Sequence, residues 1–255
     1  MRTSIIVLTA LAASVLAAPA SAADIGRSHR SDVMRVGYAS PALWTGFYVG
    51  INAGYGSGSV DQQPVFNGPD GEPLAKIKPT GWLGGVTAGY NWQSGRFVAG
   101  LETDFQLSDL TGKRSVDWCK PFCFGATSVE TIKVSMPWFG TVRGRVGFTP
   151  TDSVLIYGTG GAAYAKVRMA NDFSFSDRWG FDFTSTSTSN GYAVGWVAGG
   201  GVEWALSRSW SVKLEGLHMA LAVTDSRSTC TFCTPFSSST DIAVNIVRGG
   251  VNYRF

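Results

Sequence analysis

The feature that most constrains this chain is an alternation with a period of two residues. Large apolar residues alternate with small or polar ones in eight segments between Trp44 and Phe255. Because successive side chains of a β-strand point to opposite faces, this pattern predicts strands that each have one apolar face. The predicted strands cover residues 46–55, 82–92, 97–107, 134–148, 155–168, 192–206, 210–215 and 247–255.

The connections between these strands alternate strictly in length. Short polar turns lie at 94–95, 150–152 and 207–209, and long polar connections lie at 57–80, 111–131, 170–190 and 224–240. A soluble sandwich has no reason to alternate in this way, whereas an outer-membrane barrel has short periplasmic turns and long extracellular loops. The sequence therefore predicts an all-β fold: an eight-stranded antiparallel transmembrane up-and-down β-barrel.

The polar face carries charges of both signs among many glycines. A soluble lipocalin-type barrel would place this face in solvent, but only 15% of the residues are charged, against roughly 25% in ordinary soluble domains. A narrow interior needs small residues and charges that neutralise one another. The interpretation is a salt-bridged, closed or nearly closed interior rather than an ion-selective channel. The predicted interior charges are Glu102, Asp104, Arg143, Arg145, Glu203, Lys213, Glu215, Arg248 and Arg254.

Large aromatic residues lie on the other face, beside the short turns and the barrel termini. Amphipathic rings gather at lipid–water boundaries, so we expect them to form one girdle at the periplasmic interface. This set comprises Trp44, Trp92, Phe97, Phe148, Tyr157, Trp204, Trp210, Tyr253 and Phe255.

The first 22 residues have the form of a secretory signal peptide, with a basic start, a short apolar stretch and small residues at Ala20 and Ala22. We predict cleavage after Ala22, so that the mature chain begins at Ala23. A membrane anchor is disfavoured because a span needs about 20 apolar residues. Residues 23–43 are then a periplasmic N-terminal segment, and 44–255 are the barrel domain.

The overall charge argues against nucleic acid as a partner. Lys and Arg number 21 and Asp and Glu number 18, which gives a formal net charge of +3. A nucleic-acid-binding protein usually has a strongly basic face.

Several sequence runs carry a resemblance to a known family. The chain ends in a period-two strand with Tyr253 and Phe255, which resembles the C-terminal signal that the outer-membrane assembly machinery reads. Together with the runs 44–50, 157–164 and 249–253, it is similar to the alphaproteobacterial outer-membrane immunogenic proteins, relatives of the opacity-type surface proteins. The resemblance covers everything except the four loops. It implies an abundant surface barrel whose roles in the family range over envelope integrity, antigenicity, small-solute passage and hemin binding.

Four cysteines form two sequence pairs, Cys119 with Cys123 and Cys230 with Cys233, in the second and fourth long connections. In an exported protein, disulfides are the default. Pairing within each loop is favoured because the two loops leave opposite sides of the ring. Cross-loop bridges and a zinc site remain as alternatives. A redox role is disfavoured because no helical pattern is present there to lower a thiol pKa.

Catalysis has little support in the sequence. A lipid A deacylase would need a His and a Ser on the lipid-facing wall, and the chain has only His29, in the leader segment, and His218, in phase with outward residues. We therefore expect no enzyme activity and no catalytic, cofactor or metal site.

The expected function is structural and interfacial: to support the envelope and to present surface loops. A hemin-type surface receptor and a narrow porin are the alternatives. Phe173, Phe175, Phe181 and Phe183 predict a hairpin that continues the fifth and sixth strands beyond the membrane, where they either bind a ligand or pack on neighbouring loops. The expected partners are outer-membrane lipid and lipopolysaccharide, the assembly machinery and a host or environmental surface ligand.

Overall fold

The computed structural model describes residues 43–62, 76–117, 119, 125–223 and 240–255. The predicted signal peptide, its cleavage residues Ala20, Ala22 and Ala23, and nearly all of segment 23–43 lie outside these ranges. So do Cys123, Cys230 and Cys233. These predictions are not tested by the structure. Among the described residues, no helix has the length and apolar character needed to cross a membrane.

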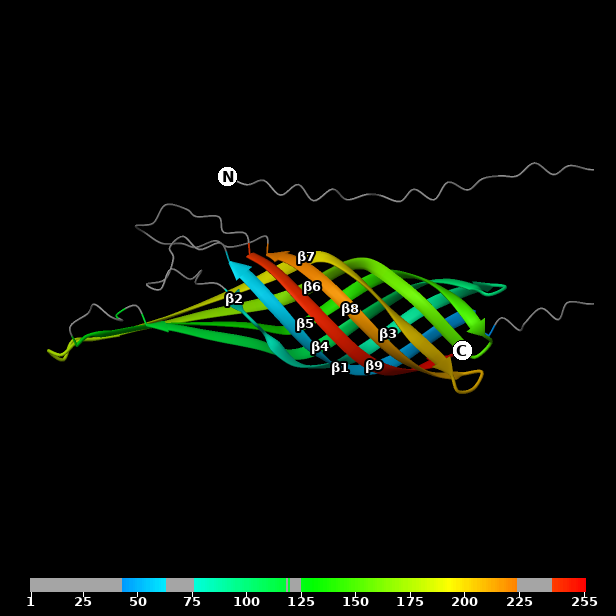
Figure 1. Ribbon diagram of the computed structural model, residues 1–255, viewed down its shortest axis with the longest axis horizontal. Helices are drawn as coiled ribbons and strands as arrows, with labels where there is room; N and C mark the ends of the chain where they lie inside the picture. The colour runs from blue at the N-terminus through cyan, green and yellow to red at the C-terminus, as the bar shows by residue number, and fades with distance from the viewer. Residues whose placement is uncertain (1–42, 63–75, 118, 120–124, 224–239) are drawn as a thin grey trace, which may run out of the picture. The chain divides into compact units, whose positions relative to one another are not determined.

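Eight long antiparallel strands close on themselves through a pairing between the first and the last (Figure 1). This arrangement confirms the predicted fold class. A two-residue strand, β2, which the alternation does not predict, pairs with β1 beside the start of β3. The strands are β1 Gly46–Gln62, β2 Lys76–Ile77, β3 Thr80–Ser94, β4 Phe97–Asp117, β5 Thr127–Thr151, β6 Val154–Ser176, β7 Asp182–Ala205, β8 Trp210–Val223 and β9 Thr240–Arg254.

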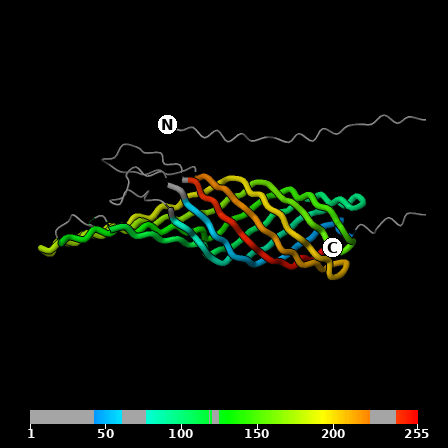
Figure 2. Tube along the Cα trace, viewed as in Figure 1, coloured from blue at the N-terminus to red at the C-terminus, as the bar shows by residue number. Residues whose placement is uncertain are grey.

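The strand register fixes the stagger of the barrel. Tracing paired residues once around the ring from Ser57 on β1, through β9 and back by way of β3, returns to β1 at Phe47, ten residues away. A stagger of this size tilts the strands by about 40° and leaves an interior that side chains can fill. Figure 2 shows the tilted strands lying side by side from blue β1 to red β9.

The two ends of the barrel differ in strand length. Three tight turns join β3 to β4, β5 to β6 and β7 to β8, the first with Gly95 at a φ of 60°. At the opposite end, β4 runs to Asp117, β5 starts at Thr127, and the β6–β7 hairpin extends to its tip at Asp177–Phe181 (Figure 1). Much of the two predicted connections 111–131 and 170–190 is therefore strand, and the hairpin predicted in the second of them is present.

The outward face carries seven of the nine predicted girdle aromatics. Phe97 contacts Phe148, and Tyr253 contacts both Trp210 and Phe255, with ring centroids 5.1–5.7 Å apart. The prediction is wrong for Trp44 and Tyr157, which are 0% and 5% exposed and lie inside the barrel. The seven are Trp92, Phe97, Phe148, Trp204, Trp210, Tyr253 and Phe255.

Two strands depart from the predicted facing. A register shift between Ser135 and Trp138 inserts an extra residue into β5 at Pro137, so Val134 and Met136 point inward while Trp138 and Val142 point outward. On β6, the apolar set is the inward one. Its inward members are Leu155, Tyr157, Ala163, Ala165 and Val167.

Candidate functional site

The inward face of each strand changes character along its length. On β8, the inward residues are first Ser211, Lys213 and Glu215, and beyond them Leu217, Met219 and Leu221. On β9, which runs the other way, Arg254, Asn252 and Arg248 lie nearest the short-turn end, with Ile246, Val244 and Ile242 beyond. The interior is thus polar in the half near the short turns and apolar in the half near the long connections.

Eight buried charges form one continuous set of ion pairs in the polar half, which we call the interior charge network. Arg143 on β5 is its centre: its guanidinium contacts Asp104 and Glu215 at 2.9 Å each, and also contacts Glu102. Arg248 on β9 reaches Glu215 at 2.7 Å and Asp104 at 3.0 Å. The members are Glu102, Asp104, Arg143, Arg145, Glu203, Lys213, Glu215 and Arg248.

Arg145 extends the network toward β7 and β1. Its guanidinium lies 2.8 Å from Glu203, donates a hydrogen bond to the Tyr48 hydroxyl at 3.0 Å, and stacks 4.0 Å from the centre of the Tyr157 ring. The Tyr48 hydroxyl in turn donates to Glu102 at 2.7 Å, and Lys213 contacts the same carboxylate at 2.9 Å. The ionic contacts therefore cross the interior from β4 and β5 to β7, β8 and β9.

The short-turn end is closed by an apolar cap. Trp44 is fully buried with Val98, Leu155 and Tyr157, and its indole N–H donates to the Asp152 carbonyl at 3.1 Å. Arg254 lies apart from the ion pairs: its guanidinium stacks 4.6 Å from the Trp44 ring centre and donates to the Leu43 carbonyl. Of the nine predicted interior charges, eight are thus linked to one another and Arg254 joins the cap.

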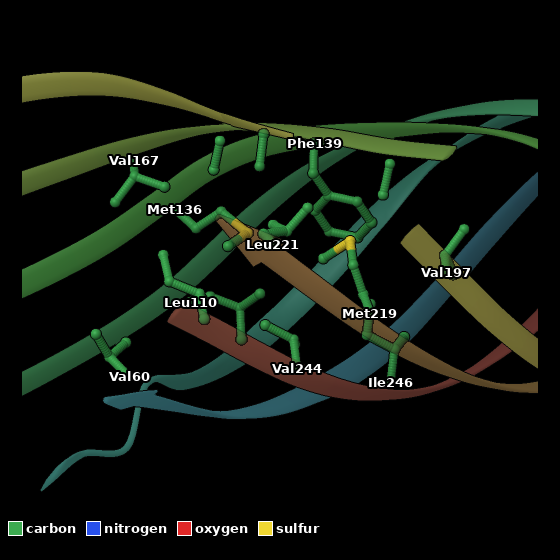
Figure 3. Packing of buried hydrophobic residues seen from close by; sticks show 14 of the residues in the cluster. Val60, Leu110, Met136, Phe139, Val167, Val197, Met219, Leu221, Val244 and Ile246 are labelled. Carbon is green, nitrogen blue, oxygen red and sulfur yellow. The ribbon is translucent and has the colours of Figure 1, made fainter. Parts of the chain in front are cut away.

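The opposite half of the interior is filled by apolar side chains from every long strand (Figure 3). Phe139, Met219 and Leu221 point toward one another from β5 and β8, with Met136, Val197 and Ile246 around them. The expectation of a polar, glycine-lined interior is therefore wrong for this half. The alternation could not reveal this apolar half on β8. Leu217, Met219 and Leu221 alternate there with His218 and Ala220, so neither face of the strand is clearly the polar one.

The physics of burial explains why the network is so densely connected. Moving a charge from water into a low-dielectric interior costs several kcal/mol, and this cost is offset only when partners and hydrogen bonds surround the charge. Neutral donors complete the hydrogen bonding of the carboxylates. Thr141 donates to Asp104 at 2.7 Å, and Ser211 and Asn252 donate to Glu203 at 2.6 and 2.9 Å. These three donors and Tyr48 are not among the site residues predicted from the sequence, although Tyr48 has the inward phase of the first strand.

The remaining residues considered for chemistry are the cysteines and His218. Cys119 is disulfide-bonded, and its pairing remains a prediction. His218 faces outward, with Nδ1 2.8 Å from the Asn245 amide oxygen and its ring 5.5 Å from that of Trp196. Within the described ranges, no group of three or more His, Cys, Asp or Glu residues could hold a metal ion.

The projecting β6–β7 hairpin carries an aromatic ladder. Phe175 pairs with Phe183 across the strands, and the rings of Phe173–Phe183 and Phe175–Phe181 are each 6.3 Å apart. Trp179 at the tip is 82% exposed, beneath the Arg178 guanidinium.

Comparison with known proteins agrees with this closed barrel. The family model described as "Outer membrane protein beta-barrel domain" matches residues 8–255. The chain belongs to this family. It is located in the outer membrane, as the names of its relatives also state.

Several relatives are outer-membrane immunogenic proteins by name. The 31 kDa outer-membrane immunogenic protein of Brucella melitensis biotype 1 is 37% identical, over 98% of this chain and 99% of the relative. The 25 kDa outer-membrane immunogenic protein of Brucella abortus biovar 1 is 29% identical over 79% and 77%. Among solved structures, Neisserial surface protein A is 14% identical, covers 83% of this chain and 98% of its own, and has a TM-score of 0.37.

Proposed function

We propose that this protein is a non-catalytic, non-conducting outer-membrane barrel that supports the envelope and presents its long connections at the surface. The observation that carries this proposal is the filled interior. The cap around Trp44, the interior charge network and the apolar half follow one another along the barrel axis. Ions would have to displace charges that already neutralise one another and then cross an apolar region, which is costly.

Planar-bilayer recording of the purified full-length protein tests this function. We expect no stable single-channel openings from protein whose heat-modifiable gel migration shows that it is folded. Stable, large and reproducible openings would overturn the proposal and favour the narrow porin. The comparison variant is Phe139→Ala with Met219→Ala. It removes side-chain volume from the apolar half of the interior and leaves the outward face unchanged.

A second candidate function, a surface receptor for a flat aromatic ligand of the hemin type, is favoured by the aromatic ladder. Phe181 and Phe183 are 61% and 49% exposed, so one face of the hairpin offers a row of mutually tilted aromatic rings to a ligand outside the cell. Such a ligand could bind there without passing through the barrel.

Hemin titration of purified protein, followed by absorbance, separates the two functions. If the ladder is a receptor, Phe175→Ser with Phe183→Ser abolishes binding, and Thr184→Ala with Thr186→Ala on the opposite face of the hairpin leaves it unchanged. Equal binding by wild type and both variants, or none by wild type, eliminates the ladder as a hemin site.

A further inference from the structure

Four basic side chains gather on the outward face of β4, β5 and β6. Their neighbours along each strand, Gly112, Val134, Ala165 and Val167, are buried in the interior, which places the basic side chains outside. Three of them are exposed, and Lys166 is half-buried. We call this set the outer basic site: Lys113, Lys133, Lys166 and Arg168.

The strand register forces these like charges together. Lys113 pairs directly with Lys133, and Arg168, which pairs with Ser135, is a diagonal neighbour of Lys133. Directly opposed side chains have Cβ atoms about 5 Å apart, and like charges in that position destabilise the sheet. The arrangement is therefore costly unless an anion from outside the chain offsets it.

The chain itself supplies only part of the compensating negative charge. No ion pair in the described ranges includes any of the four. The nearest outward acid is Asp172, on the opposite diagonal of Lys133, and Asp109 and Asp117 each lie four residues from Lys113 along β4. The site thus keeps a net positive charge.

An outward aromatic cluster adjoins the outer basic site on the side of the short turns. The ring of Trp138 lies 5.7 Å from Phe105, 6.2 Å from Tyr164 and 6.3 Å from Tyr192. Lys166 pairs with Trp138 on one side and with Tyr192 on the other, so its position is between these rings. Lysine stems lie along apolar surface while their charged heads reach the interface.

The outer basic site lies at the extracellular boundary of the lipid-facing wall. Toward the short turns, outward residues such as Val142 and Val146 are apolar, whereas toward the long connections they are polar, as at Ser115 and Thr131. Aromatic residues occupy this boundary in outer-membrane barrels, next to the headgroups of the outer leaflet.

We propose that the outer basic site binds the phosphate groups of a phosphorylated glycolipid of the outer leaflet, the lipid A part of lipopolysaccharide. Its phosphates offset the opposed Lys113 and Lys133 and contact Arg168, and its acyl chains pack against the Trp138 cluster. This site goes beyond the closed-barrel function and does not depend on whether the interior conducts.

Native mass spectrometry of the full-length protein with added lipid A tests the proposal. The test variant replaces Lys113, Lys133 and Arg168 by Gln. The matched control replaces Arg96, Arg178 and Arg208 by Gln, which removes the same charge from exposed turns. We expect roughly a 100-fold loss of affinity for diphosphoryl lipid A in the test variant only, because each Lys or Arg near a charged membrane surface contributes about a fivefold factor.

The wild-type protein provides a readout that needs no substitution. It should bind diphosphoryl lipid A at least tenfold more tightly than dephosphorylated lipid A, and millimolar inorganic phosphate should not displace the lipid. Equal affinity for the two lipids, full displacement by phosphate, or equal losses in the test and control variants would each overturn the proposal. Heat-modifiable migration of both variants is measured first, so that a loss of affinity is not attributed to unfolded protein.

Discussion

Arg143 contacts three of the four carboxylates in the interior charge network, Glu102, Asp104 and Glu215, from the centre of the barrel. Arg143→Met would leave these charges short of a partner in a region that water does not reach. We expect the free energy of unfolding to fall by about 3–5 kcal/mol, measured by urea titration in detergent micelles. Arg178→Met at the exposed hairpin tip is the control, with an expected change within about 0.5 kcal/mol.

A second variant keeps this prediction specific to charge. Arg143→Met combined with Glu215→Gln removes one base and one acid, so it should recover part of the lost stability. If the double variant is no more stable than Arg143→Met, packing rather than charge explains the loss.

Gly54 and Gly216 form a matched pair on the two faces of the wall. A Cβ on Gly54 would lie 2.6 Å from the Arg248 Cβ and against the Val247 carbonyl, whereas a Cβ on Gly216 would meet no atom within 4 Å. Gly54→Ala should destabilise the barrel by about 1–3 kcal/mol through overpacking. Gly216→Ala should change unfolding in the same assay by less than about 0.5 kcal/mol, and equal effects would contradict the assigned facing.

Single residues also show where prediction from the sequence stops. Alternation alone places Glu102, Arg143 and Arg248 inward, because each follows a large apolar residue of the opposite face. Those preceding residues are Leu101, Val142 and Val247, and all three are exposed on the outer wall. It fails for Tyr157, since both faces of β6 hold small and aromatic residues and the phase of that strand is ambiguous. Trp44 precedes the first strand, where no period applies, and only the folded chain shows it as the cap.

At the scale of the strands, the end of the β6–β7 hairpin projects beyond the barrel and packs on none of its interior. None of the interior residues lies within 172–186. Replacing these residues by an Asn-Gly turn should leave heat-modifiable migration intact and the urea midpoint within error of wild type. A clear loss of stability would show that the projecting strands support the barrel.

The strands also account for what the sequence could predict of the fold. Eight runs and their alternating connections suffice to predict the closed antiparallel ring and its localisation. The extra residue at Pro137 is invisible to a fixed period, so the facing of Val134 and Met136 was wrong. The division of the interior into polar and apolar halves depends on which residues meet across the barrel, and no local pattern reports that.

At the scale of the whole molecule, the short turns and the hairpin tip lie at opposite ends of the barrel (Figure 1). An epitope inserted after Trp179 should be labelled by antibody on intact cells. The same epitope inserted after Asp152, in the β5–β6 turn, should be labelled only after the outer membrane is permeabilised. Labelling of both epitopes on intact cells, or of the Asp152 epitope alone, would contradict the predicted orientation, in which the short turns face the periplasm.

The pairing of β1 with β9 has a consequence for how the chain assembles. These strands are far apart in sequence, so their seam is the joint that turns an open sheet into a cylinder. The contacts of Lys213 with Glu102 and of Arg248 with Asp104 join β8 and β9 to β4 across the interior. A two-residue slip at the seam would keep every side chain on its proper face yet shear both contacts apart. Pairing of β1 with β9 in the correct register is therefore the step that completes the interior charge network. The network disfavours barrels with a shifted register, which burial of apolar side chains alone would tolerate.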